Sequence, residues 1–394
     1  MAQTLSGVAP IHEDRIRARR WSAENTNLET VMAQLRQLHH DVALHEVDPH
    51  QHPHPKNCVL NLVVAADDQH RVTACDKLVA HLAASHPLRA IIVHLHGGGG
   101  PGTLDAEITV EAHQLLNGFP VQREQVLLHV RGEAGHHLSS LVEPLLVDDV
   151  PTYLWWSGRH RLDEAIVQDA ISFSDVLVVD SGKFEHPINA VLELAGLAAD
   201  PHATVGVADF RWGRVRPWRD AIGQFFGPED RRALLPGLQE VSADAAGTGP
   251  EARTGAALLA GWAVSALGWR FVDAAAAGPD ATRAIAVAGH DHRVRVTLRS
   301  VPNDRLHNGE LLTVRLAGRR GRRAFMLTIE RDPDGDNHAN VTIRLDGGEP
   351  VRQRLTLPRL GDPDLLVHVL WANQRDPVFH GALRAAVPLL EAMR

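Results

Sequence analysis

Residues 126–158 read VLLHVRGEAGHHLSSLVEPLLVDDVPTYLWWSG, and this stretch decides the fold class. The apolar run Val126–Val130 is typical of a buried strand, and Thr152–Trp156 is a second such run. Between them, apolar residues recur at helical spacing from Leu138 to Leu146, with Pro144 expected to bend or delay the helix. A strand, a helix and a strand with short joints form a βαβ unit, which requires a parallel sheet covered by helices.

The loop after the first of these strands is polar. Ligands and partners usually meet an open α/β sheet at the carboxyl ends of its strands. The loop offers Arg131, Glu133, His136 and His137, the best polar constellation in the chain. These groups fit either an anion held at the N-terminus of the following helix or a loop that caps that helix and contacts another protein. The second interpretation is favoured.

The second strand ends in Trp155-Trp156, two of only eight tryptophans. Aromatic residues are common anchors of protein interfaces, so both are candidate partner contacts. Neighbouring strand residues face opposite sides of a sheet, so at least one of the two indoles is expected to be buried.

Length, net charge, apolar runs and cysteine number limit the class of protein to which the chain can belong. A length of 394 residues predicts two domains, and the net charge of −8 argues against a nucleic-acid binder. The sequence has no run of about 18 apolar residues, so no membrane span is expected. The N-terminus lacks the apolar segment of a secretory signal, so we expect a cytoplasmic protein. Cys58 and Cys75 cannot build a disulfide framework and are expected to be small buried hydrophobic residues.

Periodicity predicts the domain organisation. A mobile, Arg-rich arm (1–25) precedes an α/β domain (26–241) with a mostly parallel sheet flanked by helices. An α+β domain (242–394) follows, because from residue 284 the apolar residues alternate with polar ones, as in an antiparallel meander covered by helices. The small polar residues 242–253 are expected to form a linker or long loop, and Pro217 is expected to limit a helix to the residues after it.

Two further stretches suggest a ligand site, but neither has the residue pattern that a metal site or a nucleotide-binding loop requires. Histidines crowd the segment 39–54, at positions His39, His40, His45, His50, His52 and His54, yet its prolines favour a surface loop over a metal site. The run Gly97–Gly100 follows a strand and is able to cradle phosphate, but it lacks the residues of a nucleotide fingerprint, so a hairpin connection is expected. The basic run Arg319–Arg323 is expected to be a solvated turn.

No catalytic set is visible in the sequence. It holds no Gly-x-Ser-x-Gly elbow, no His-Glu-x-x-His and no Cys-x-x-Cys. Residue patterns alone therefore favour a binding or regulatory protein, without a cofactor or a metal.

Four segments, in this order, carry a resemblance to a known family: SHPLRAIIV, LHVRGEAGHHLSSLVEPLLVDDVPTYLWWSG, FSDVLVVDS and LLAGWAVSALGW. Together they resemble the family of the glucose-6-phosphate dehydrogenase assembly protein OpcA, from about residue 28 to the C-terminus. The Arg-rich arm and the His-rich segment are departures from this resemblance.

The resemblance implies a non-catalytic partner of glucose-6-phosphate dehydrogenase. Such a protein favours the active oligomer of the enzyme and raises its activity in the oxidative pentose phosphate pathway. The resemblance also suggests a redox response through cysteines, for which Cys58 and Cys75 are the candidates. The alternative is an enzyme that binds a sugar phosphate with the Gly97–Gly100 loop and the Arg131 loop.

Overall fold

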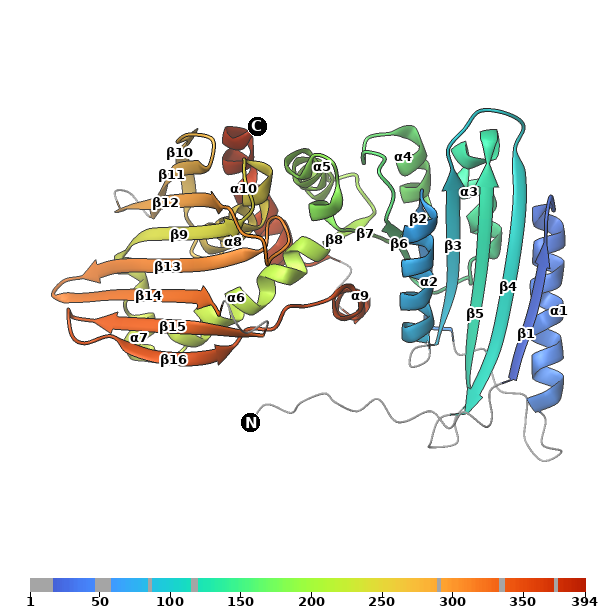
Figure 1. The fold of residues 1–394 in the computed structure, drawn as a ribbon, viewed down its shortest axis with the longest axis horizontal. Coiled ribbons are helices and arrows are strands. Elements are labelled where there is room, and N and C mark those ends of the chain that lie inside the picture. The colour runs from blue at the N-terminus through green and yellow to red at the C-terminus, as the bar shows by residue number, and fades with distance from the viewer. Residues whose placement is uncertain are drawn as a thin grey trace. The chain divides into compact units, whose positions relative to one another are not determined.

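The computed structural model describes residues 17–46, 58–83, 87–114, 120–288, 292–332, 337–371 and 375–394 (Figure 1). These residues form two compact units, Met1–Val179 and Asp180–Arg394. The expected boundary at 241/242 therefore falls inside the second unit. None of the helices in the described ranges is both long and apolar enough to cross a membrane.

The first unit is built on a mixed, mostly parallel sheet. Its strands are β1 (Arg17–Ala23), β2 (Leu60–Ala66), β3 (Leu88–His96), β4 (Thr103–Gln114), β5 (Pro120–Arg131), β6 (Thr152–Trp156) and β7 (Val176–Val179). They stand in the order β1-β4-β5-β3-β2-β6-β7. Strands β5, β3, β2, β6 and β7 run parallel, whereas β4 is antiparallel to β1 and β5. Strand β1 occupies part of the segment expected to be a mobile arm, and residues 1–16 lie outside the described ranges.

Helices pack on this sheet and explain its continuous apolar runs. They are α1 (Leu28–Glu46), α2 (Gln69–Ala83), α3 (Leu138–Val142) and α4 (Ala165–Ser172). Helix α1 contacts β1 and β4, α2 contacts β2 and β3, and α4 contacts β6. Every residue of β2 is buried, as is every residue of β3 but the last, which is typical of parallel strands covered on both faces.

The βαβ prediction is confirmed, with a shorter helix than expected. Strands β5 and β6 are parallel members of one sheet, separated by β3 and β2. Helix α3 ends at Val142, and a 3₁₀ turn (Glu143–Leu145) contains Pro144. Proline lacks an N–H and clashes with the preceding turn, so the α-helix ends before it.

The second unit is built on a mostly antiparallel sheet. Its strands are β9 (Leu238–Ala246), β10 (Arg270–Ala276), β11 (Ala281–Ala288), β12 (His292–Val301), β13 (Leu311–Arg320), β14 (Arg323–Arg331), β15 (His338–Leu345) and β16 (Val351–Thr356), in the order β10-β11-β12-β9-β13-β14-β15-β16. Among these described strands, only β9 and β12 pair in parallel. Buried and more exposed residues alternate along β12 and β14, which confirms the expected wetter face. The expected meander is confirmed for β10–β12 and for β13–β16, but β9 lies between β12 and β13.

The unit also contains helices. They are α5 (Pro187–Ala199), α6 (Phe210–Phe226), α7 (Glu229–Arg232), α8 (Thr254–Ala266), α9 (Asp362–Trp371) and α10 (Pro377–Met393), and a short strand β8 (Gly206–Asp209) precedes α6. Helices α6, α8 and α10 contact the strands of the sheet. Helices α8 and α10 pack on each other, and α10 also contacts α5, β10 and β11. Two expectations are wrong here. Pro217 lies inside the continuous helix α6, and residues 242–246 belong to β9, in the interior of the sheet, rather than to a linker.

Candidate functional site

The carboxyl edge of the parallel sheet brings the expected polar loop next to the end of β3. In the register of β3 and β5, His94 lies opposite His129, and His96 lies opposite Arg131. Residues Gly132–His136 then form a 3₁₀ turn, and α3 begins at Leu138. We call residues 131–137 the edge loop.

The glycine-rich connection after β3 packs against the edge loop. The N–H of Glu133 donates to the carbonyl of Gly100 (3.2 Å). Gly132 has φ +64°, and a Cβ on it would lie 2.4 Å from the Gly100 oxygen, so only glycine allows this approach. The expected hairpin is wrong, because β5 lies between β3 and β4. The glycines serve close packing of two backbone segments at the sheet edge.

The four polar candidates of the edge loop are all exposed. They are Arg131, Glu133, His136 and His137. Arg131 donates from Nη1 to Asp105 Oδ2 (2.6 Å), and this hydrogen bond holds the pKa of Asp105 below its usual range. The loop therefore presents polar groups to solvent from a backbone fixed to β3 and β4.

The two tryptophans of β6 are both buried. Trp155 is 5% and Trp156 1% exposed, because β6 has β2 on one side and β7 on the other, and residues on both faces of the strand are covered. Buried side chains offer no area to a partner, so the expectation that these indoles contact one is corrected. They contribute to the core that supports the edge.

The cysteines lie apart from the edge loop in the sequence. Cys58 precedes β2, is half-buried, and its thiol donates to the carbonyl of Leu60 (3.2 Å). Cys75 lies in α2 and is buried. No disulfide joins these two residues. Burial raises the pKa of the Cys58 thiol, which disfavours the reactive thiolate.

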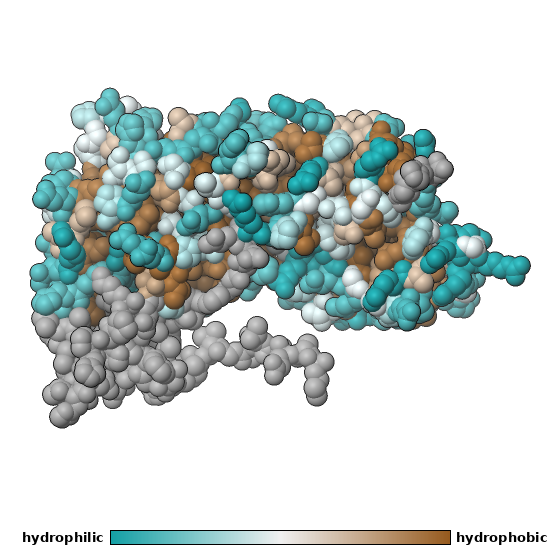
Figure 2. All heavy atoms as spheres, turned by 180° about the vertical axis from the view of Figure 1, so that it is seen from behind, coloured by the Kyte–Doolittle hydropathy of each residue, from teal (hydrophilic) through white to brown (hydrophobic). Residues whose placement is uncertain are grey.

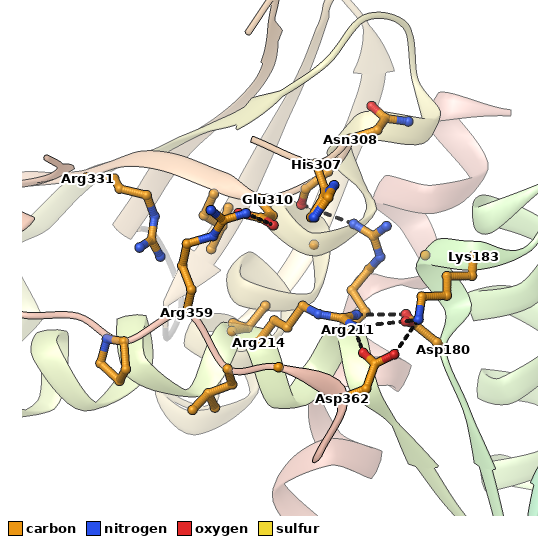
Figure 3. Close-up of a pocket in the computed structure, with 18 residues that line it drawn as sticks. Asp180, Lys183, Arg211, Arg214, His307, Asn308, Glu310, Arg331, Arg359 and Asp362 are labelled. Carbon is orange, nitrogen blue, oxygen red and sulfur yellow. Dashed lines mark hydrogen bonds and ion pairs between the residues drawn. The ribbon is translucent and has the colours of Figure 1, made fainter. Parts of the chain in front are cut away.

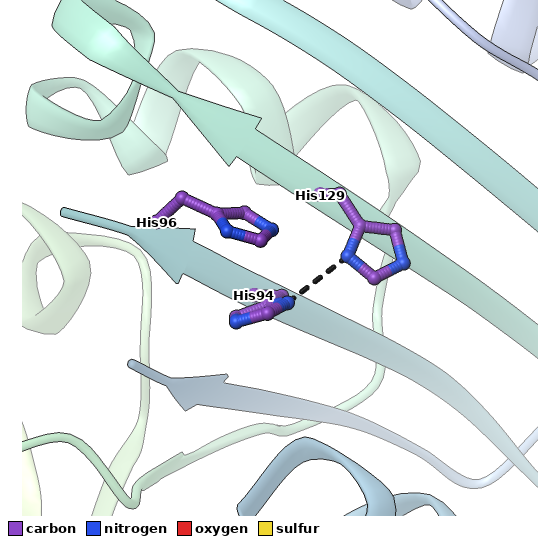
Figure 4. Close-up of side chains that lie close together, drawn as sticks. All are labelled: His94, His96 and His129. Carbon is purple, nitrogen blue, oxygen red and sulfur yellow. Dashed lines mark hydrogen bonds between the residues drawn. The ribbon is translucent and has the colours of Figure 1, made fainter. Parts of the chain in front are cut away.

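Sequence reasoning missed a cluster of histidines at the same sheet edge (Figure 4). His94 and His96 of β3 and His129 of β5 place one ligand nitrogen each within 4.8 Å of one another. We call them the histidine cluster. The sequence signal is the His-x-His alternation in one strand, but its pairing with His129 depends on the register of β3 and β5.

The His-rich segment 39–54 is arranged differently from the histidine cluster. His39 and His40 lie in α1, and His39 is buried and pairs through Nε2 with Glu124 Oε1 (2.5 Å). The backbone of His45 is also in α1, whereas His50, His52 and His54 lie outside the described residues.

The second unit contains a pocket of about 530 Å³ whose lining is rich in charge (Figure 3). We call it the charged pocket. Its basic side chains are Lys183, Arg211, Arg214, Arg331 and Arg359, and its acidic side chains are Asp180, Glu310 and Asp362. The five positive and three negative side chains leave an excess of two positive charges, which favours an anionic ligand.

Most of these charges are committed to one another. Arg214 donates from Nη1 and Nη2 to the two oxygens of Asp180 (2.8 and 2.9 Å), and it also reaches Asp362 (2.8 Å). Lys183 donates to Asp362 (2.6 Å). Burial alone raises the pKa of Asp180, but the hydrogen bonds and charge of Arg214 outweigh it and hold this pKa below its usual range. The network ties the chain after β7 to α6 and to the start of α9.

The Arg211 guanidinium donates to a backbone carbonyl rather than to a carboxylate. Arg211 is 7% exposed, and its Nη1 donates to the carbonyl of Gly309 (3.0 Å). Its Nε is buried and has no hydrogen-bond partner among the described residues. A Cβ on Gly182 or Gly309 would lie 2.1 Å from this guanidinium, so both glycines make room for it.

The fold and these sites define a two-unit protein with one mostly parallel and one mostly antiparallel sheet. Residues 79–196 match the family model of the glucose-6-phosphate dehydrogenase subunit N-terminal domain, and residues 205–383 match that of the C-terminal domain. The chain belongs to the OpcA family of glucose-6-phosphate dehydrogenase assembly proteins, as the sequence resemblance predicted.

Curated relatives carry the same family name. An OxPP cycle protein OpcA of Synechocystis sp. is 28% identical over 197 residues, which are 48% of this chain and 38% of that protein. The OpcA of Nostoc punctiforme is 25% identical over 198 residues, 49% of this chain and 41% of that protein. The chain thus aligns with less than half the length of these relatives.

Solved structures show only a distant likeness. KijD10, a 3-ketoreductase from Actinomadura kijaniata in complex with TDP-benzene and NADP, is 11% identical with a TM-score of 0.47, covering 85% of this chain and 96% of that one. The dehydrogenase GnnA from Acidithiobacillus ferrooxidans is 11% identical with a TM-score of 0.39, covering 85% and 99%. At these scores the likeness carries no conclusion about function.

Proposed function

We propose that this chain is a non-catalytic assembly factor and allosteric activator that binds glucose-6-phosphate dehydrogenase and favours its active oligomer. The observation that supports this function most is the match to both domains of the family, which together span parts of both units. The partner is the enzyme named in the family description.

The edge loop is the proposed contact surface. Its exposed Arg131, Glu133, His136 and His137 stand on a backbone held by the Gly97–Gly100 connection. Exposed large hydrophobic side chains elsewhere are scattered; among the described residues they are Val59, Val272, Val301, Val351 and Val378. On the face shown in Figure 2, hydrophobic residues likewise appear as separate patches among hydrophilic ones. A polar, rigid surface suits a partner recognised through hydrogen bonds and charge.

Activation requires differential binding. A protein shifts an enzyme toward its active oligomer only by binding that form more tightly than the inactive one. A rigid edge loop suits this role, because little conformational entropy is lost when it binds.

The test is to mix the purified chain with glucose-6-phosphate dehydrogenase from the same organism. We expect the two proteins to co-elute, the enzyme to shift to a larger oligomer by light scattering, and its turnover to rise or its apparent substrate constant to fall. The double variant Arg131→Ala/His137→Ala should weaken binding roughly 30-fold, the effect of losing about 2 kcal/mol at an interface hot spot.

The matched control is Lys77→Ala, which removes an exposed charge of α2 in the same unit. It should bind the enzyme as the unmodified chain does. Absence of co-elution and of any kinetic effect would refute the function. Equal binding by the double variant and the control would refute only the proposed surface.

A second candidate is an enzyme that binds a sugar phosphate. The glycine-rich and Arg131 loops are poorer sites for it than expected, since Gly100 accepts a bond from Glu133 and Arg131 pairs with Asp105. The charged pocket, with its positive excess and buried Arg211, is the observation that favours it. Turnover of a sugar phosphate by the chain alone would establish this function, and its absence at millimolar substrate would exclude it.

A further inference from the structure

We propose that His94, His96 and His129 bind one Zn²⁺ ion at the carboxyl edge of the parallel sheet. The inference rests on the side chains of the histidine cluster and does not depend on the proposed assembly function.

The strands place the three imidazoles without the help of a loop. His94 and His96 are alternate residues of β3, so their side chains start on the same face of the sheet. His129 lies directly opposite His94 in the neighbouring parallel strand. The ring centroids of His94 and His96 are 3.7 Å apart, and that of His129 lies 5.2 Å from His94 and 5.7 Å from His96.

The nitrogen positions fit a small divalent cation. A tetrahedral zinc site has Zn–N bonds of about 2.0–2.1 Å, which puts ligand nitrogens roughly 3.3 Å apart. Nδ1 of His94 and Nδ1 of His129 are 3.0 Å apart, close to one edge of such a tetrahedron. The ligand atoms of all three residues lie within 4.8 Å of one another, so side-chain rotations that move His96 by on the order of 1 Å complete the site.

The cluster holds a polar atom that the fold does not satisfy. Nε2 of His96 is buried and has no hydrogen-bond partner among the described residues. A buried nitrogen left in this way normally costs free energy, and a bound cation removes that cost.

Burial disfavours the protonated form of His94 and His96. Burial, with the charges of its neighbours, lowers the pKa of His94 to about 4, and burial also lowers the pKa of His96. Neutral imidazole is the ligand for Zn²⁺. The Arg131 guanidinium opposes a cation here, but its hydrogen bond to Asp105 pairs it with a carboxylate that offsets its charge.

The site leaves one coordination position open. His96 and His129 also line a cleft of about 410 Å³ that includes Ser22, Gln69, Asp105 and Arg131. Three imidazoles and water, reached through this cleft, give the four-coordinate geometry that zinc prefers. Metal there would cross-link β3 to β5 close to where the glycine-rich connection and the edge loop begin.

The test uses the full chain purified without a polyhistidine tag, stripped with a chelator and titrated with ZnCl₂ against a chromophoric chelator. We expect one tight site per chain. His96→Gln and His129→Gln should each weaken it by more than about 100-fold, because even the outer-shell partners of a metal are worth 10–100-fold. These two residues are chosen because both are less buried than His94 and their replacement perturbs the core less.

The matched control is His81→Gln, which removes an exposed histidine of α2 in the same unit. It should keep the tight site. Cobalt(II) provides a second readout: the unmodified chain and the control should show the intense visible bands of tetrahedral Co²⁺, and the two cluster variants should not.

Three results would overturn the proposal. They are the absence of a tight site in the unmodified chain, equal affinity in His96→Gln, His129→Gln and the control, or a cobalt spectrum of octahedral type. Each of these leaves the assembly function standing, since that is measured by binding and kinetics with the dehydrogenase.

Discussion

In the charged pocket of the second unit, Asp180 accepts two hydrogen bonds from Arg214, and Asp362 accepts from both Arg214 and Lys183. In the histidine cluster of the first unit, His94 and His129 face each other at 3.0 Å, and Nε2 of His96 has no partner among the described residues. Both regions hold a buried nitrogen without a hydrogen-bond partner among the described residues, Nε of Arg211 and Nε2 of His96, but in the pocket most opposite charges pair with one another. Paired charges stabilise the fold, whereas converging ligand nitrogens without a charged partner make the histidine cluster a candidate binding site.

The largest expected effect is on the free energy of unfolding, through the ion pairs of the charged pocket. Asp180→Asn removes the charge that Arg214 and Lys183 share, and breaking a buried ion pair typically costs 3–5 kcal/mol of unfolding free energy. We expect about 3 kcal/mol, the lower end, because Arg214 keeps its hydrogen bond to Asp362. Urea unfolding measures it. Asp220→Asn, whose carboxylate is 59% exposed beside Arg216, is the control and should change stability by less than about 0.5 kcal/mol.

The same pair predicts a pH dependence with a definite sign. The folded-state pKa of Asp180 is below its usual value of 3.8, so the folded form binds its proton less readily than the unfolded chain. Its stabilisation is therefore complete above the unfolded pKa and is lost as pH falls through the folded one. The difference in unfolding free energy between the unmodified chain and Asp180→Asn should shrink below about pH 4. A difference that stays constant to pH 3 would contradict the ion-pair account.

A smaller effect is expected at the support of the edge loop. Gly132→Ala places a Cβ 2.4 Å from the Gly100 oxygen at a φ of +64°, so the two backbone segments must separate. Strain and overpacking of this kind cost about 1–3 kcal/mol. Binding to the dehydrogenase should weaken as well, because the loop loses its support. Thermal unfolding and co-elution measure both effects.

The control for that substitution lies in the same glycine-rich connection. A Cβ on Gly97 would meet nothing within 4 Å, so Gly97→Ala should leave stability and partner binding nearly unchanged. If both variants behave alike, the two backbone segments do not support each other.

The sequence predicts the elements whose own residues determine them. The continuous apolar runs of β2 and β3 predict a covered parallel sheet, and the alternation in β12–β15 predicts the meander. The sequence pattern does not predict strand β9, because its alanines and serine have low strand propensity. Packing against α8 and pairing with β12 and β13 hold these residues in the strand.

The sites depend more on tertiary structure. The edge loop is predictable because one contiguous segment forms it. The histidine cluster needs the register of two strands separated by 33 positions, His96 to His129, and the charged pocket joins residues between Asp180 and Asp362. The burial of both tryptophans likewise follows from the place of β6 inside the sheet. Register and sheet order are set by the whole core, so no local pattern reveals them.

The smallest expected effect is on the stability of the metal-free histidine cluster. Without metal, His129→Gln should change the unfolding free energy by less than about 1 kcal/mol, since it removes at most one neutral hydrogen bond, to His94. With saturating ZnCl₂, the unmodified chain should gain several degrees in unfolding temperature and the variant should not, because only the folded site binds the ion. A large loss of stability in the metal-free variant would mean that the cluster, like the charged pocket, is committed to the fold. The difference between the two regions would then disappear.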